Sequence, residues 1–226
     1  MEYLLMNKDE KLLRFSIGKQ LGMEEITNCK ILSKVLPIGF DDISTWLHRR
    51  NRSKHKSHFK KWLKEWGIDS IEGFINISHC LGLNDCFWVK PSDSSLRWND
   101  VSLYKNEFSD IAQRTAFETG LCGLHLSSTN LTSPEFTMEG AAPKCWMRES
   151  NDILLYKAKF SGACNVGKEP YSEYMASLIS SQILPSVKYN IEVFNKTLCS
   201  TCKLFTDEDT GFVPFIKYVK RVSLVC

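Results

Sequence analysis

The chain has 226 residues, of which 43% are hydrophobic and 24% charged, and its formal net charge is +3. This composition is typical of a globular protein with a packed core, and the charge is too small to indicate nucleic-acid binding by itself. No apolar run reaches the roughly 18 residues of a membrane helix. The charged start "MEYLLMNKDEKLLRF" is not typical of a signal peptide. We therefore expect a cytoplasmic protein without a membrane partner.

Residues 1–115 predict an N-terminal α+β domain that begins with a β-hairpin. The runs "EYLLM" and "LLRFSI" flank the polar turn "NKDEK", and "ILSKVLPIGF" predicts a further short strand. A helix follows, capped by Asp41 or Asp42. Its predicted buried residues are Ile43, Trp46 and Leu47. The sequence thus predicts a hairpin that is interrupted by a helical insertion.

Two more helices are predicted within this insertion. Residues at i, i+3, i+4 and i+7 mark the buried side of the first one. These residues are Phe59, Trp62, Leu63 and Trp66. The second begins at Asp69 or Ser70, with Ile71, Phe74 and Ile75 directed inward. The run "CFWVKP" then predicts a strand, and "RWNDVSLYKNEF" predicts a turn with a short strand or helical turn.

Residues 116–226 predict a second α+β domain, an antiparallel sheet with one principal helix. The runs "KCWMRE", "DILLYKAKF" and "VKYNIEVF" predict strands, and residues 171–184, "YSEYMASLISSQIL", predict the helix. Two further strands are predicted at "CSTCKLF" and "FVPFIKYV", joined by the acidic turn "TDEDTG". The predicted fold class is therefore α+β in both domains.

A basic stretch at residues 48–64 is the first candidate site. Its cations are Arg49, Arg50, Arg52, Lys54, Lys56, Lys60, Lys61 and Lys64. Such a stretch is either a solvated helix face or a contact for nucleic acid or an acidic protein complex, and both interpretations stay open. On the second interpretation, reversing Arg49, Arg50, Lys54 and Lys56 to glutamate is expected to abolish partner binding and leave the fold intact.

The nine cysteines contain a single pair at motif spacing, Cys199 and Cys202. A structural zinc site needs four ligands, and the sequence has no second CxxC or HxxxH to complete one. The histidines also lack metal-site spacing with any carboxylate. We predict reduced, buried cysteines and no metal site.

The second candidate site combines a small-residue loop, a strand lysine and a helix glutamate. Backbone N–H groups of a loop such as Gly140 and Ala141 can approach phosphate oxygens closely. Lys157 ends an apolar run and could hold phosphates if a helix carboxylate such as Glu173 oriented it. Each feature has an ordinary structural explanation, and Lys159 lies on the same face of the predicted strand as Lys157. The common glycine-rich nucleotide motifs are absent.

The segments "TMEGAAPKCW", "DILLYKAKF" and "EPYSEYMASLI" resemble the small lobe of HipA-like serine/threonine kinases, the toxin kinases of bacterial toxin–antitoxin systems. Upstream, "LGLNDCFWVKP" and "WNDVSLYKNEFS" resemble the N-terminal region of HipA-related proteins of Firmicutes and their mobile elements. The resemblance implies that Gly140, Ala141, Lys157 and Glu173 bind a nucleotide.

The same resemblance implies a phosphorylation site and an adenine contact. Thr137 matches the place of a hydroxyl that the family autophosphorylates, and Ser133 is a second candidate. The run "FVPFIKYV" resembles the strand that leads into the kinase hinge, so the backbone of residues 215–217 would face an adenine ring.

The printed sequence departs from the family after this hinge. A family member continues with a catalytic-loop aspartate and with residues that hold magnesium. Asp207, Glu208 and Asp209 precede the hinge and lie in a predicted turn, so they do not replace these groups. We therefore expect no kinase activity from this chain alone and no required cofactor, and weak ATP binding stays open.

Two functional hypotheses follow from the resemblance. The first is a catalytically incomplete fragment, or pseudokinase, that acts as a protein-binding module, as an inhibitor or regulator carried by a mobile element. The second is the small-lobe half of a split kinase, which needs a second chain for phosphotransfer. Both imply another protein as the partner.

Overall fold

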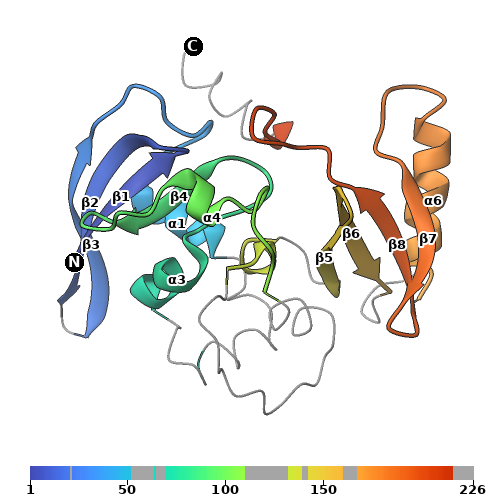
Figure 1. Cartoon of the computed structure of the whole chain (residues 1–226), viewed down its shortest axis with the longest axis horizontal. Helices are drawn as coiled ribbons and strands as arrows, with labels where there is room; N and C mark the ends of the chain where they lie inside the picture. The colour runs from blue at the N-terminus through green and yellow to red at the C-terminus, as the bar shows by residue number, and fades with distance from the viewer. Residues whose placement is uncertain are drawn as a thin grey trace. The chain divides into compact units, whose positions relative to one another are not determined.

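The structure is a computed structural model. It describes residues 1–20, 22–51, 64, 70–109, 132–138, 142–159 and 167–215. They form two units, each with a four-stranded antiparallel sheet (Figure 1). Unit 1 comprises Met1–Asn106, Thr132–Met138 and Thr206–Cys226, and unit 2 comprises Glu107–Leu131 and Glu139–Phe205. The predicted α+β class is confirmed, and the predicted domain boundary near residue 115 lies outside the described residues.

The sheet of unit 1 has the strand order β3-β2-β1-β4. Its strands are β1 (Glu2–Asn7), β2 (Glu10–Gln20), β3 (Met23–Ile31) and β4 (Phe87–Pro91). The central strand β1 buries four consecutive residues, Tyr3 to Met6, between its two neighbours. The predicted hairpin of β1 and β2 and the predicted strand β4 are confirmed.

The strand expected within residues 31–40 is wrong in position. Gly22 adopts a positive φ of 79°, so the chain turns back directly after β2. The returning strand β3 pairs with β2 and ends at Ile31, where the predicted strand begins. Most of β3 is exposed, so its residues lack the alternating apolar pattern from which a strand is predicted.

Helix α1 (Ile43–Arg50) begins where the sequence predicts it. The Asp42 carboxylate accepts a hydrogen bond from the Thr45 N–H at 2.8 Å, which caps one of the free N–H groups of the first turn. Its buried residues are the three that were predicted, Ile43, Trp46 and Leu47. The expected helix with Phe59, Trp62, Leu63 and Trp66 on its buried side lies outside the described residues, apart from Lys64.

Helix α3 (Ile71–Ser78) has two N-terminal caps. The Ser70 hydroxyl oxygen accepts from the Gly73 N–H at 2.9 Å, as its place before the apolar run predicted. The Glu24 carboxylate of β3 accepts from the N–H groups of Ile71 and Glu72 at 2.5 and 3.2 Å. This second cap joins α3 to the edge of the sheet. The described part of unit 1 also contains the short helix α4 (Trp98–Val101) and the 3₁₀ helix η2 (Pro134–Phe136).

His79 ends α3 and gives unit 1 a predicted pH dependence. Its ring Nδ1 lies 3.2 Å from the Val89 carbonyl oxygen, and burial lowers the pKa of the ring from its ordinary value of 6.5. The unfolded chain then binds a proton that the folded chain does not, so stability falls as the pH drops through about 6.5. We expect a lower urea midpoint at about pH 5.5 than at about pH 7.5.

The variant His79→Asn should reduce this pH dependence, because an asparagine side chain does not titrate. Asparagine also tolerates the positive φ of 47° at this position. His48→Asn is the matched control, since His48 is exposed on α1. A pH dependence in His79→Asn as large as in the natural chain would contradict the assignment.

The sheet of unit 2 has the strand order β5-β6-β8-β7. Its strands are β5 (Lys144–Glu149), β6 (Asp152–Ala158), β7 (Tyr189–Phe194) and β8 (Thr197–Lys203). One face buries Cys145, Tyr156, Ala158 and Cys199. Helix α6 (Glu169–Ser180) contacts β6, β7 and β8, and it runs beside β7 in Figure 1. The predicted antiparallel sheet and its helix are thus confirmed in the described part of unit 2, although the helix spans Glu169–Ser180 instead of the predicted residues 171–184.

Residues 206–212 return from unit 2 to unit 1. The Thr206 hydroxyl donates to the Leu83 carbonyl, and the Phe212 N–H donates to the Asn84 carbonyl at 2.7 Å. The predicted strand "FVPFIKYV" is therefore wrong in its described part, since Phe212 to Pro214 lie outside any strand. The Phe212 N–H is already used by unit 1, and Pro214 has no N–H to offer a sheet.

Candidate functional site

Lys157 and Glu173 form an ion pair across the layers of unit 2. Lys157 lies in β6, whose alternation directs it to the face that α6 covers, and Glu173 lies on α6. The side chains are 29% and 23% exposed, so water screens the pair only in part. The sequence predicts this partner for Lys157, and the structure shows the pair. The role of the pair in nucleotide binding stays a prediction.

Ser200 holds the second oxygen of the Glu173 carboxylate. It lies directly opposite Lys157 in the pairing of β6 with β8, it is fully buried, and its hydroxyl donates to Glu173. The carboxylate is therefore fixed from two sides, by an ammonium and by a hydroxyl. The sequence does not predict Ser200 as part of this site, because the register of β6 against β8 brings it to Lys157 and a single sequence does not reveal that register.

The Cys202 thiol and the Glu169 carboxylate also act on Lys157. Burial lowers the pKa of the Lys157 ammonium and raises the pKa of the Cys202 thiol. Cys202 hydrogen-bonds with Tyr189, the first residue of β7. Lys159, the competing lysine, lies beyond the end of β6 and is exposed. Lys157 is therefore the better candidate for a lysine held in one orientation.

Four further residues are predicted for the nucleotide and phosphorylation sites. Gly140 and Ala141 lie outside the described residues. Thr137 and Ser133 belong to unit 1. The Thr137 hydroxyl donates to the Leu81 carbonyl at 2.8 Å, and Ser133 is buried with its hydroxyl donating to Glu135. Phosphorylation at either position stays a prediction, and at Ser133 it would require this buried contact to break.

The first two arginines of the basic stretch form ion pairs within unit 1. The Arg49 guanidinium lies 2.9 Å from the Asp41 carboxylate. Arg50 donates to both carboxylate oxygens of Asp85, and its guanidinium lies 4.7 Å from the centre of the Trp46 ring. The Arg50 side chain is only 12% exposed. These two cations are therefore partly neutralised by acidic residues of the same chain.

This placement corrects the expectation that charge reversal leaves the fold intact. A glutamate at position 50 would face Asp85 with a like charge, and it would lose the contact with Trp46. Gly82 leaves space for this guanidinium, since a Cβ there would lie 2.9 Å from Nη1 of Arg50. A partner contact through the other predicted residues stays a prediction. These residues, Arg52, Lys54, Lys56 and Lys60, lie outside the described part of the chain.

The acidic turn after β8 belongs to unit 1, and contacts within that unit hold its three carboxylates. Glu208 accepts from the Trp98 indole, and its second oxygen lies 3.0 Å from Nζ of Lys105. Asp207 accepts from two backbone N–H groups, and Asp209 lies 3.1 Å from Nζ of Lys8. These contacts give the three carboxylates structural roles. That the turn does not supply the carboxylates of phosphotransfer stays a prediction.

The cysteine pair does not form a joint site. Cys199 and Cys202 lie three residues apart in β8, so their side chains project from opposite faces of the sheet. None of the cysteines that the structure describes forms a disulfide, and all of them except the exposed Cys29 are buried as predicted. No three His, Cys, Asp or Glu side chains among the described residues could together hold a metal ion.

Comparisons with known proteins add no relative. No protein-family model, no curated protein and no solved structure matches the chain. Over the described ranges, none of the helices has both the length and the apolar character of a membrane span.

Proposed function

We propose that unit 2 is a nucleotide-binding small lobe of HipA-like type, in which Lys157 receives the phosphates of ATP. The ion pair between Lys157 and Glu173 is the observation that carries this proposal. In kinases a strand lysine contacts the phosphates and a helix glutamate orients it, and both residues occupy such elements here. The Ser200 hydroxyl supports the proposal, because it restricts the carboxylate that orients the lysine.

This lobe binds ATP weakly and does not transfer phosphate by itself. A nucleotide that contacts a single lobe keeps one face in water. Transfer also needs a base for the acceptor hydroxyl and carboxylates for magnesium. The described carboxylates after β8 are held by contacts within unit 1. The proposal therefore places the catalytic groups outside this lobe, and in a split kinase a second polypeptide would supply them.

A second candidate is a protein-binding module without catalysis, such as an inhibitor or regulator. It is favoured by an apolar, exposed side of α6, which includes Met175 and Ile179. Exposed apolar patches of this kind mark interaction surfaces. The two candidates share a dependence on another protein and differ in whether ATP is bound through Lys157.

Titration calorimetry with ATP and magnesium tests the nucleotide site. We expect Lys157→Ala to weaken ATP binding at least about tenfold, because a charge-assisted contact contributes about 1.5–3 kcal/mol. Lys159→Ala is the matched control, since it removes an exposed lysine two residues further on. Equal affinities of the natural chain and Lys157→Ala would remove Lys157 from the site.

Incubation with labelled ATP and magnesium completes the test. We expect no label on the protein or on a generic acceptor, since the described residues do not supply the magnesium carboxylates. Label on Thr137 or Ser133 would show that the chain is a complete kinase, which contradicts the proposal.

A further inference from the structure

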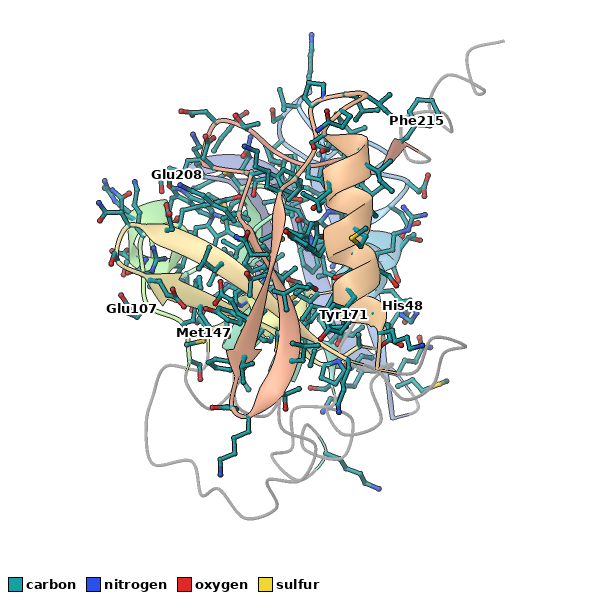
Figure 2. The ribbon with its side chains drawn as sticks, turned by 90° about the vertical axis from the view of Figure 1, so that its right-hand side faces the viewer. His48, Glu107, Met147, Tyr171, Glu208 and Phe215 are labelled. Atoms are coloured by element: carbon teal, nitrogen blue, oxygen red, sulfur yellow. The ribbon has the colours of Figure 1, made fainter. Side chains whose placement is uncertain are left out.

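Helix α6 presents a continuous apolar stripe to solvent. The stripe begins with Tyr171, Met175, Leu178 and Ile179, at the i, i+4, i+7 and i+8 spacing of one helical side. Ile183 and Leu184, in the turn that follows the helix, are exposed apolar residues as well. These six side chains, which we call the α6 stripe, are 45–75% exposed. In Figure 2 the helix faces the viewer, and Tyr171 is labelled near its first turn.

The polar side of the same helix is turned toward the sheet. Glu173 pairs with Lys157 and accepts from Ser200. Ser177 is buried, its hydroxyl donates to the Tyr174 carbonyl, and its oxygen lies 3.3 Å from the N–H of Tyr189. A surface helix normally has the opposite arrangement, with its apolar side on the core. The orientation of α6 is therefore fixed by polar contacts, which leaves its apolar side available to another surface.

The absence of charged residues around the stripe agrees with a second copy of the chain as that other surface. The segment "YMASLISSQILPSV", residues 174–187, contains no Asp, Glu, Lys or Arg. In a twofold-symmetric interface each residue meets the same surface of the other copy, so any charge near the axis would face a like charge. The small exposed residues Ser172 and Ala176 lie beside the stripe and permit a close approach of two helices.

The area of the stripe agrees with a pair of copies. From their exposed fractions, the six side chains present roughly 600 Å² in each copy, so a symmetric pair would bury roughly 1,200 Å². This is the lower limit for specific protein interfaces. A helix of 12 residues is about 18 Å long, which is enough for such a contact.

We propose that the α6 stripe is a self-association surface, on which a second copy of this chain docks through its own α6. The proposal is independent of ATP binding, because Lys157 and Glu173 lie on the other side of the helix. It goes beyond the split-kinase proposal and differs from the second candidate, since it assigns the exposed side of α6 to a second copy and not to a different protein.

Sedimentation velocity on the full chain over a concentration series tests the proposal. We expect a concentration-dependent dimer. The double variants Met175→Lys/Ile179→Lys and Met175→Glu/Ile179→Glu should each raise the dimer dissociation constant at least about tenfold, because like charges then meet across the axis. An equimolar mixture of the two should form the heterodimer, in which the introduced charges are complementary.

The matched control is Val35→Lys/Ile38→Lys, which adds the same charge at two exposed apolar positions of unit 1. This control should dimerise like the natural chain. Circular dichroism should show that the α6 variants remain folded, since their side chains point away from the sheet. ATP titration of the same variants separates this proposal from the nucleotide site.

Three results would overturn the proposal. One is a natural chain that stays monomeric over the whole series. Another is a dimer that the α6 variants do not weaken. The third is a mixture of the lysine and glutamate variants that fails to associate, which would show that the stripe is covered by something other than a second copy.

Discussion

Replacing Asp85 with alanine is expected to lower the free energy of unfolding of unit 1 by about 2–3 kcal/mol. The substitution leaves the Arg50 guanidinium, which is 12% exposed, without the carboxylate that binds it. It also removes the acceptor of the Phe87 N–H at the start of β4. The cost is large because a mostly buried cation loses its counterion and regains little water.

Urea denaturation followed by tryptophan fluorescence measures this effect, since Trp46 lies against the Arg50 guanidinium. Asp209→Ala is the matched control. It removes an aspartate of the same unit whose partner, Lys8, is itself well exposed, so the expected cost is below about 0.5 kcal/mol. Equal costs for the two variants would show that burial of the Arg50 pair contributes nothing to stability.

The second large effect is expected from Glu173→Ala, which should destabilise unit 2 by about 2 kcal/mol. The variant leaves the Lys157 ammonium without its carboxylate and the fully buried Ser200 hydroxyl without its acceptor. Both groups lie in the layer between α6 and the sheet, where hydration cannot replace the lost contacts fully.

Hydrogen exchange resolved to individual strands measures this effect within unit 2. Amides of β6 and β8 should exchange faster in Glu173→Ala, while amides of β1 and β2 in unit 1 keep their rates. Asp152→Ala is the control, because both side chains of the ion pair between Asp152 and Lys203 are exposed. Unchanged exchange in β6 and β8 would mean that Glu173 does not hold the helix on the sheet.

Local signals in the sequence predicted the elements of both units well. Asp42 and Ser70 precede apolar helical patterns, and both side chains cap the helices that they precede. The strands of unit 2 were predicted from short apolar runs between turn residues, and all four are present. These features depend on neighbours within a few residues, which a single sequence displays directly.

Contacts between distant residues could not be predicted in the same way. Asp85 was not singled out, although it neutralises Arg50 from 35 positions away. Ser200 contacts Glu173 only because of the register between two strands. The run "FVPFIKYV" has a strand-like composition, but the N–H of its first residue, Phe212, donates to the Asn84 carbonyl of unit 1. In each case the deciding partner lies far along the chain.

The path of the chain between the two units determines the order in which they can be completed during synthesis. A ribosome makes β5 to β8 and α6 before it makes residues 206–212, which close unit 1. Until Glu208 emerges, the Trp98 indole and the Lys105 ammonium lack the carboxylate that joins them in the finished protein. Translation of unit 1 therefore begins first and ends last, and its contacts with Glu208 form only after unit 2 has been translated.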